Sequence, residues 1–334
     1  MSNTVNNEEL ALFEKGMTKC LNCTKWYDTS GMEPLSEFNC QSCDSVVLTP
    51  YRISQYWLYD LIGEGGMGYV YLAQQPRDLN LYAIKIAAIE GDHEDDDFRF
   101  ESLLYEGEIY IEMDHPNIPK AHNFGYKHGV AFLIMDYEFG YQLDEYLAQE
   151  GVFPIARKTI ASWMCQLVSA LQYMKNKDYI YRDLKPQNIL IDGEYAILTD
   201  LGLCMHMDHH KDIDEANLVG SPAYLPPERV AAMPEDFRSD MYSLGMLFFF
   251  IINGSNFFDG ESHEEIVEMH MTPERESVIS INPTICPEFA AILDKLISYS
   301  PDERYQSYEE LLADIDALVL NLVATDKKST AAKT

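Results

Sequence analysis

The segment 179-YIYRDLKPQNIL-190 concentrates polar side chains that could transfer a phosphoryl group. Asp183 can accept a proton from an attacking hydroxyl group, and Lys185 can neutralise negative charge on a transferring phosphoryl group. Asn188 can ligate a divalent cation through its amide oxygen, and Asp200, which follows an apolar run, offers a second ligand at a turn. Together these residues supply the groups that metal-dependent phosphoryl transfer requires.

A glycine-rich stretch, 63-GEGGMG-68, fits the pattern G-x-G-x-x-G through Gly63, Gly65 and Gly68. Glycine lets the backbone approach phosphate oxygens closely. The pattern alone is a weak signal, because glycine turns between strands are common. The strand-like run 69-YVYLA-73 follows it where a dinucleotide-binding fold would have a helix, so that fold is disfavoured.

Lys85 lies within the apolar, strand-like run 81-LYAIKIAAI-89. A buried ammonium group needs an anionic partner, although a lysine can also reach solvent with its charged end. The sequence predicts a helix over residues 98–113, after an acidic loop over 90–98. That helix offers four acidic partners: Glu101, Glu106, Glu108 and Glu112.

The elements that must position these residues change character along the chain. Strand-like alternation begins near Tyr56, and a further strand is expected over 130–137. Helical periodicity then places an apolar face on residues 155–176. Further helices are expected over 240–252, 262–270, 287–299 and 307–323.

The ordered motifs resemble the eukaryotic-type Ser/Thr protein kinases, including those found in bacteria, over about residues 56–320. The matching segments are GEGGMGYV, YAIK, HPNI, YRDLKPQN, DLG, GSPAYLPPE, SDMYSLG and PDERYQS. The resemblance implies an α+β, bilobal protein-kinase fold with a small β-rich lobe and a larger helical lobe. It also implies transfer of the ATP γ-phosphate to protein hydroxyl groups, with Mg²⁺ or Mn²⁺.

The resemblance assigns a role to each polar residue. Asp183 would be the catalytic base, Lys185 would contact the γ-phosphate, and Asn188 would bind Mg²⁺ together with Asp200. The residues implied to bind the nucleotide and its metal are Gly63, Gly65, Gly68, Val70, Ala83, Lys85, Glu106, Met135, Asp136, Glu138 and Asp200.

Within this set, Lys85 would hold the α- and β-phosphates and pair with Glu106. Met135 falls at the gatekeeper position, and 136–138 would be the hinge whose backbone binds adenine. The resemblance also implies two structural contacts, an ion pair between Glu228 and Arg304 and a brace from Asp240 to the backbone of the catalytic loop.

Two positions depart from the family pattern. Tyr181 replaces a histidine that packs beneath the catalytic loop, and we expect the aromatic ring to keep that role. Leu201 replaces the phenylalanine after the metal-binding Asp200, a common change in the family. We therefore expect an active kinase, with a pseudokinase scaffold as the alternative.

The activation segment, residues 200–228, contains no Ser, Thr or Tyr between Leu201 and Gly220. In the family, an arginine at position 182 commonly binds a phosphorylated residue of this loop. The sequence predicts that Arg182 instead pairs permanently with one of the loop acids, so that activity needs no loop phosphorylation. A solvated acidic loop is the alternative. The four candidate acids are Asp208, Asp212, Asp214 and Glu215.

Four cysteines follow the spacing C-x₂-C-x₁₆-C-x₂-C: Cys20, Cys23, Cys40 and Cys43. This spacing is typical of a structural Zn²⁺ site and resembles zinc-ribbon or rubredoxin-like knuckles. An iron site or a redox dithiol pair remains an alternative. Such a module could dock a protein partner, which the sequence does not identify, or brace the small lobe.

The chain of 334 residues has a formal net charge of −31. This charge disfavours nucleic-acid and membrane-surface partners and favours substrates with basic residues, although it also simply promotes solubility. The start of the chain lacks the apolar core of a secretory signal. The apolar run 244-LGMLFFFIIN-253 is about half as long as a membrane span, so we expect a cytoplasmic protein with no span.

The expected organisation is a polar lead over 1–15, a zinc-ribbon-like module over 16–50, a kinase N-lobe over 51–138, a kinase C-lobe over 139–323 and a disordered tail over 324–334.

Overall fold

The computed structural model describes residues 4–65, 68–78, 80–88, 94–127, 129–149, 151–152, 154–208 and 220–331. The chain divides into two compact units. The first comprises Met1–Asp114 and Pro119–Glu138, and the second comprises His115–Ile118 and Phe139–Thr334.

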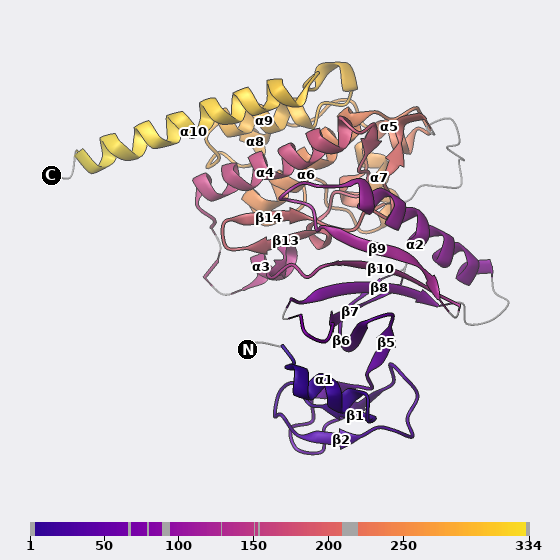
Figure 1. Ribbon diagram of the computed structural model, residues 1–334. Helices are drawn as coiled ribbons and strands as arrows, with labels where there is room; N and C mark the ends of the chain where they lie inside the picture. The colour runs from indigo at the N-terminus through magenta and orange to yellow at the C-terminus, as the bar shows by residue number, and fades with distance from the viewer. Residues whose placement is uncertain are drawn as a thin grey trace. The chain divides into compact units, whose positions relative to one another are not determined.

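The first unit is built on a six-stranded antiparallel sheet with the strand order β5-β6-β7-β8-β10-β9 (Figure 1). Its strands are β5 (Tyr51–Ile53), β6 (Tyr56–Gly65), β7 (Gly68–Gln74), β8 (Tyr82–Ala88), β9 (Ala121–Lys127) and β10 (Val130–Asp136). Helix α2 (Glu94–Glu112) packs against β8, β9 and β10. The helix begins four residues before the predicted start, so part of the predicted acidic loop is helical. Residues 90–93 of that loop lie outside the described residues.

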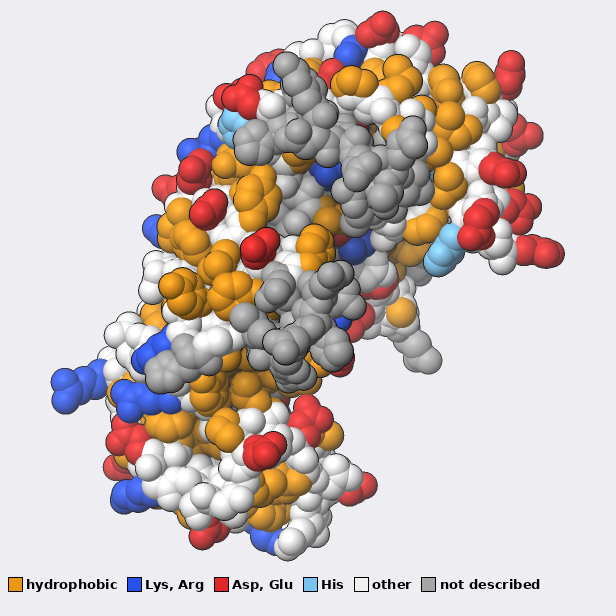
Figure 2. All heavy atoms as spheres, turned by 90° about the vertical axis from the view of Figure 1, so that its right-hand side faces the viewer, with side chains coloured by type: hydrophobic (Ala, Val, Ile, Leu, Met, Phe, Trp, Pro, Cys, Tyr) orange, Lys and Arg blue, Asp and Glu red, His pale blue; other side chains and the backbone are white. Residues whose placement is uncertain are grey.

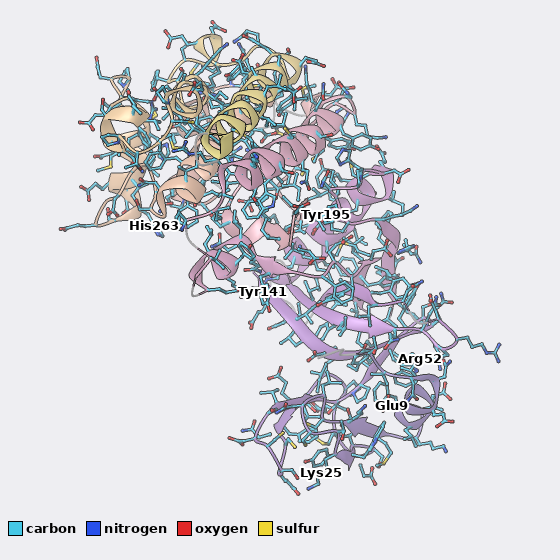
Figure 3. All side chains as sticks on the ribbon, turned by 90° about the vertical axis from the view of Figure 1, so that its left-hand side faces the viewer. Glu9, Lys25, Arg52, Tyr141, Tyr195 and His263 are labelled. Carbon is cyan, nitrogen blue, oxygen red and sulfur yellow. The ribbon has the colours of Figure 1, made fainter. Side chains whose placement is uncertain are left out.

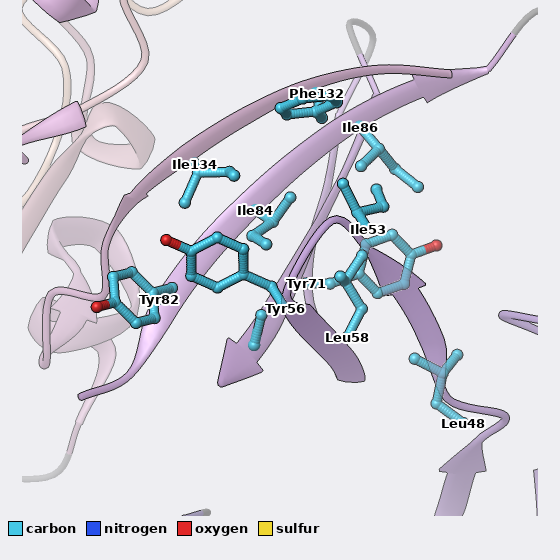
Figure 4. Packing of buried hydrophobic residues seen from close by; sticks show 11 residues of the cluster. Leu48, Ile53, Tyr56, Leu58, Tyr71, Tyr82, Ile84, Ile86, Phe132 and Ile134 are labelled. Carbon is cyan, nitrogen blue, oxygen red and sulfur yellow. The ribbon is translucent and has the colours of Figure 1, made fainter. Parts of the chain in front are cut away.

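One face of this sheet carries a continuous apolar core (Figure 4). Ile84 and Ile86 of β8 point into this core, as do Phe132 and Ile134 of the neighbouring β10. Side chains alternate between the two faces of a strand, so Ala83 and Lys85 lie on the opposite face of β8. The alternation explains how an apolar run can hold a lysine without placing it in the main core.

The cysteine segment forms two antiparallel hairpins within the first unit. Their strands are β1 (Met17–Lys19), β2 (Trp26–Asp28), β3 (Glu37–Asn39) and β4 (Val46–Leu48). The two hairpins repeat one hydrogen-bond pattern, because the N–H of Cys20 bonds to the Lys25 carbonyl at 2.9 Å and the N–H of Cys40 bonds to the Ser45 carbonyl at 2.8 Å. Each CxxC pair therefore occupies the turn of its hairpin.

The polar lead contains a helix that the sequence did not lead us to expect, α1 (Asn7–Phe13). Asn6 caps this helix by accepting hydrogen bonds from the N–H groups of Glu8 and Glu9, and the Glu9 side chain accepts a hydrogen bond from the Asn6 N–H at 2.9 Å. This reciprocal pair is a capping box, which satisfies donors that a helix start otherwise leaves open. Figure 3 labels Glu9 of this helix and Arg52 of β5.

Helix α1 covers an apolar patch on the sheet, made by Trp57 and Tyr59 of β6 and Leu72 of β7. Leu10 and Phe13 of the helix are buried in this cluster. A buried hydrogen bond of 2.7 Å also joins the Val5 N–H to the Gln74 side chain, and an ion pair of 2.6 Å joins Lys19 of β1 to Glu9. The polar lead therefore packs directly on the sheet, and the ion pair joins the first hairpin to the lead.

The second unit is mainly helical. Its helices are α3 (Leu143–Ala148), α4 (Arg157–Lys175), α5 (Pro227–Val230), α6 (Phe237–Asn253), α7 (His263–His270), α8 (Val278–Ile281), α9 (Pro287–Leu296) and α10 (Tyr308–Ala331). Helix α6 is largely buried, as its apolar run predicts, and α4 contacts both α6 and α10 (Figure 1). The sequence predicts a disordered tail over 324–334, but helix α10 continues to Ala331. Residues 332–334 lie outside the described residues.

Short strands flank the loops of the second unit. They are β11 (Tyr141–Gln142), β12 (Tyr179–Ile180), β13 (Ile189–Asp192), β14 (Tyr195–Leu198) and β15 (Met205–His206). Strand β12 pairs with β15 and β13 pairs with β14, so the segment between β12 and β13 is held at both ends. That segment contains the polar residues Asp183, Lys185 and Asn188.

Acidic side chains are spread over the second unit on the face shown in Figure 2 rather than gathered in one patch. Among the described residues, no helix is both long enough and apolar enough to cross a bilayer.

Candidate active site and metal centre

The buried lysine of the first unit has the partner that the family resemblance implies. Lys85 Nζ lies 2.7 Å from Glu106 Oε2, and the two side chains are only 9% and 1% exposed. Glu106 reaches the lysine from α2, which the sheet holds against β8. The pair supplies the counter-ion that a buried ammonium requires, so the predicted ion pair is confirmed.

The glycine-rich stretch is the turn between β6 and β7, with Gly65 opposite Gly68. Gly68 has φ of +137°, and a Cβ at this position would lie 2.2 Å from the carbonyl oxygen of Ile86. Only glycine fits there, because the backbone of β8 passes too close for a side chain. Positions 66 and 67 of the stretch lie outside the described residues.

The register of the sheet places the other candidate nucleotide-binding residues beside Lys85. Val70 lies directly opposite Lys85, and Ala83, two residues before Lys85, lies opposite Met135 of β10. Directly opposed residues in antiparallel strands share a face. Val70, Ala83, Lys85 and Met135 therefore line one face of the sheet, away from its main core.

Two backbone N–H groups of the candidate hinge already form hydrogen bonds within the first unit. The N–H of Asp136 donates to the Lys120 carbonyl at 2.9 Å, and the N–H of Tyr137 donates to the Leu81 carbonyl at 3.2 Å. The Asp136 carboxylate also lies 2.6 Å from His122 Nε2. Adenine would therefore have to bond to other backbone groups of the hinge.

In the second unit, Asp183 is the centre of a compact hydrogen-bonded group. Lys185 Nζ donates to Asp183 Oδ2 at 2.7 Å, and Asn188 Nδ2 donates to the same oxygen at 2.8 Å. Asn188 Nδ2 also lies 2.9 Å from the Asp183 carbonyl oxygen. Within the part of the chain that the structure describes, no side chain donates to Asp183 Oδ1, so this oxygen can accept a proton.

Burial raises the pKa of Asp183 above that of an ordinary aspartate. Lys185 and Asn188 oppose this shift by bonding to the charged form, while the negative charge of Asp200 adds to it. A higher pKa makes the carboxylate a stronger base, which suits proton removal near neutral pH. Asp200 itself has φ of +57°, an unusual conformation for a residue other than glycine.

Tyr181 is fully buried beneath the loop that carries Asp183. Its hydroxyl donates to the Thr199 carbonyl at 2.7 Å, directly before Asp200. The Asp240 carboxylate accepts the N–H groups of Tyr181 and Arg182, each at 2.8 Å, so the predicted brace is confirmed. Burial raises the pKa of Asp240 to about 6. Tyr181 thus supports both segments that hold candidate catalytic groups.

Replacing Tyr181 by Phe is expected to keep the packing of the ring and to remove the hydroxyl's bond to Thr199. The loss should be about 1 kcal/mol of unfolding free energy, measured by chemical denaturation. Phosphate transfer should fall only a few-fold, since the ring remains in place. Tyr195→Phe is the control, because Tyr195 (labelled in Figure 3) is 65% exposed. Equal stability of the two variants would show that the buried hydroxyl contributes nothing.

The described partner of Arg182 is not one of the predicted loop acids. Arg182 Nη2 lies 2.9 Å from Glu235 Oε1, and Glu235 also binds Arg229. Glu235 precedes α6 and lies outside the activation segment. Of the four loop acids, Asp208 forms no described bond to Arg182, and the other three fall outside the described residues. Neither Glu235 nor Arg229 stands out in the sequence.

The second predicted ion pair is present. Arg304 Nη1 and Nη2 bind the two oxygens of Glu228 at 2.7 and 2.8 Å. Burial favours the neutral form of Glu228, but the bonds from Arg304 outweigh this effect and hold the pKa of Glu228 below its ordinary value. Ser239 Oγ also donates to Glu228, at 2.6 Å.

The four paired cysteines converge in the first unit, with all four Sγ atoms within 4.8 Å of one another. A tetrahedral Zn²⁺ with Zn–S bonds of about 2.3 Å separates its sulfur atoms by about 3.8 Å, so the cluster has the size of such a site. The Tyr27 hydroxyl lies 2.9 Å from Cys40 Sγ and helps to lower the pKa of Cys40 to about 6. The donor set and its surroundings therefore fit a metal that binds thiolates.

The two-unit fold and these side-chain groups define the class of protein. The chain belongs to the protein kinase domain family, which it matches over residues 56–314. Serine/threonine-protein kinase PrkC of Bacillus subtilis is 32% identical over 266 residues, which are 79% of this chain and 40% of that protein.

Serine/threonine-protein kinase PknB of Mycolicibacterium smegmatis is 28% identical over 80% of this chain and 43% of its own length. Serine/threonine-protein kinase ULK3 of Xenopus laevis is 30% identical over 78% of this chain and 55% of its own length. The chain thus spans about two fifths of the length of these bacterial relatives.

Proposed function

We propose that this chain is a serine/threonine protein kinase that transfers the γ-phosphate of ATP to hydroxyl groups of protein substrates. The observation that carries the proposal is the convergence of Lys185 and Asn188 on one oxygen of the buried Asp183. A carboxylate fixed in this way presents its other oxygen to an incoming hydroxyl group in one orientation. The family match supports the same activity.

Each residue of this group has a task in the proposed reaction. Asp183 takes the proton of the attacking hydroxyl through Oδ1, and Lys185 stabilises charge on the transferred phosphoryl group. Asn188 and Asp200 would hold Mg²⁺ or Mn²⁺, and the bound metal would supply positive charge that stabilises the phosphate oxygens. In the first unit, Glu106 orients Lys85 toward the α- and β-phosphates.

Two alternatives are less well supported. A scaffold without turnover is not favoured, because Lys85, Asp183, Asn188 and Asp200 are all present. A kinase of small molecules is disfavoured by the segment 220-GSPAYLPPE-228, since such relatives generally lack it.

We also propose that the kinase acts without phosphorylation of the activation segment and prefers substrates with basic residues. The absence of Ser, Thr and Tyr between Leu201 and Gly220 supports the first proposal. The second rests on the net charge of −31 and on the acids Glu138, Asp144 and Glu145.

The test is transfer of labelled phosphate from Mg²⁺-ATP to the chain and to a basic protein, followed by identification of the phosphorylated amino acids. Phosphoserine or phosphothreonine is expected, with transfer by an Asp183→Asn variant lowered by about 10²–10⁴-fold. Tyrosine as the main acceptor would contradict the assignment to serine and threonine. Nucleotide binding without any transfer would favour the scaffold.

For the cysteine cluster we propose one structural Zn²⁺ held by Cys20, Cys23, Cys40 and Cys43. Elemental analysis of the purified chain should find one Zn²⁺ per chain, and Cys40→Ser should reduce that value well below one. Cys286→Ser is the control, since Cys286 lies outside the cluster. Iron in place of zinc would support a rubredoxin-like site, and the absence of both metals would support a dithiol pair.

A further inference from the structure

Glu235 is a carboxylate with no exposed side-chain surface that binds two arginines at once. Its Oε1 accepts from Arg182 Nε at 3.1 Å and from Nη2 at 2.9 Å. Its Oε2 accepts from Arg229 Nε at 2.9 Å and from Nη2 at 2.6 Å. Four N–H groups of two arginines therefore bind one buried carboxylate, an arrangement of charge-assisted hydrogen bonds that fixes its orientation.

Arg229 also contacts the backbone of the catalytic loop. Its Nη1 donates to the Arg182 carbonyl at 2.6 Å. On the other side of the same residue, Asp240 accepts the Arg182 N–H at 2.8 Å. The side chain, the N–H and the carbonyl of Arg182 are thus each bonded to this group of charged residues.

These hydrogen bonds hold Arg182 in a strained backbone conformation. Arg182 has φ of +73°, in the left-handed region that residues other than glycine rarely adopt. Such a conformation persists only where its surroundings determine it. Because Asp183 follows directly, the dihedral angles of Arg182 set the direction in which the Asp183 side chain leaves the backbone.

We propose that Glu235 is a positioning residue for Asp183 and the permanent counter-ion of Arg182. Glu235 belongs to the chain itself, so the loop obtains its negative partner without covalent modification of the activation segment. The inference rests on the proposed kinase function, for which it supplies the means of activity without loop phosphorylation.

The test compares Glu235→Gln with the parent chain after phosphatase treatment, with intact mass confirming that no phosphate remains. The parent should transfer phosphate at full rate from the first time point, without a lag. Glu235→Gln should lower kcat about ten-fold and change KM for ATP less than about two-fold, because only the base is misplaced. Glu235→Asp should recover part of kcat, since it restores the charge. Glu268→Gln, at an exposed position of α7, is the control.

Hydrogen exchange of the peptide that contains Tyr181 and Arg182 gives a second readout, independent of activity. Faster exchange in Glu235→Gln, at unchanged exchange of α4, is the expected result. An unchanged kcat or unchanged exchange in a folded variant would overturn the inference and leave the kinase assignment intact. A lag that phosphorylation abolishes would overturn it as well. If the parent chain transfers no phosphate, the proposed function fails, and exchange alone then decides whether Glu235 restrains the loop.

Discussion

Asp183→Asn is expected to lower kcat by about 10²–10⁴-fold, the usual contribution of a positioned general base. This factor corresponds to about 3–5 kcal/mol of transition-state stabilisation. Asparagine has nearly the same shape and can still accept the bonds from Lys185 and Asn188 through its amide oxygen. The variant should therefore fold normally and lose only the ability to take a proton.

The measurement is steady-state kinetics with a peptide substrate, together with ATP affinity from a direct binding experiment. ATP affinity should change less than about two-fold, because the proposed base contacts the acceptor hydroxyl rather than the nucleotide. Asp192→Asn is the control, since Asp192 is an exposed aspartate at the end of β13. A variant that keeps more than a tenth of the parent kcat would exclude Asp183 as the base.

Arg304→Met should destabilise the second unit by about 3–5 kcal/mol, the cost of leaving a buried charge without its partner. Arg304 is almost completely buried, and besides Glu228 it bonds the carbonyls of Ser298 and Arg238 at 2.9 and 2.8 Å. Methionine fills similar space but offers no donors. The Glu228 carboxylate then keeps its bond from Ser239 but loses both bonds from a charged partner.

The pH dependence separates this loss of charge pairing from a loss of packing. In the parent chain, Arg304 lowers the pKa of Glu228, so the pair's stabilisation is present at neutral pH and is lost as pH falls. In the variant, Glu228 is buried without Arg304, so its pKa should rise and protonation should favour the folded state. The stability difference between parent and variant should therefore shrink from pH 7 toward pH 4 in denaturant titrations.

Lys295→Met is the matched control for Arg304→Met. Lys295 forms an ion pair of 2.6 Å with Glu310, but the two side chains are 35% and 45% exposed. Solvent screens such a pair, and its removal should cost no more than about 1 kcal/mol. If both variants lost the same stability, at all pH values, the importance assigned to burial of the Glu228 pair would be wrong.

The residues that sequence reasoning located correctly are those whose roles depend on local order. Lys85 is identifiable as a lysine within an apolar strand, whereas the choice of Glu106 among four acids of the helix came from the family resemblance, and the structure joins the two at 2.7 Å. Asp183, Lys185 and Asn188 fall within one loop, so their proximity follows from the chain itself. Their chemical roles remain predictions, and the Asp183→Asn variant tests the role of the base.

The partner of Arg182 could not be predicted for the opposite reason. Glu235 is 53 positions away, and nothing in its own neighbourhood distinguishes it from the other acids of a chain that has 55 Asp and Glu residues. Only the packing of α5 and the start of α6 brings the carboxylate to the loop. Long-range pairing of this kind depends on the fold as a whole.

Helix α1 was missed although its signals are present. The capping box is visible as Asn6 and Glu9, and Leu10 and Phe13 have helical spacing. Seven residues are too few for periodicity to be decisive, and so short a helix has little stability without tertiary contacts. Its stability comes from the apolar patch on β6 and β7, whose location the sequence does not reveal.

The packing of α1 has a consequence for synthesis of the chain on the ribosome. Phe13 is translated about 60 residues before Leu72, a delay of roughly 3–12 s at ordinary elongation rates of about 5–20 residues per second. The cysteine hairpins are complete by Leu48, so they can bind metal and fold during that interval. The apolar side of α1 is left uncovered until β6 and β7 emerge. Nascent chains should therefore be most prone to aggregation, or most in need of a chaperone, at lengths between the end of the hairpins and the end of β7.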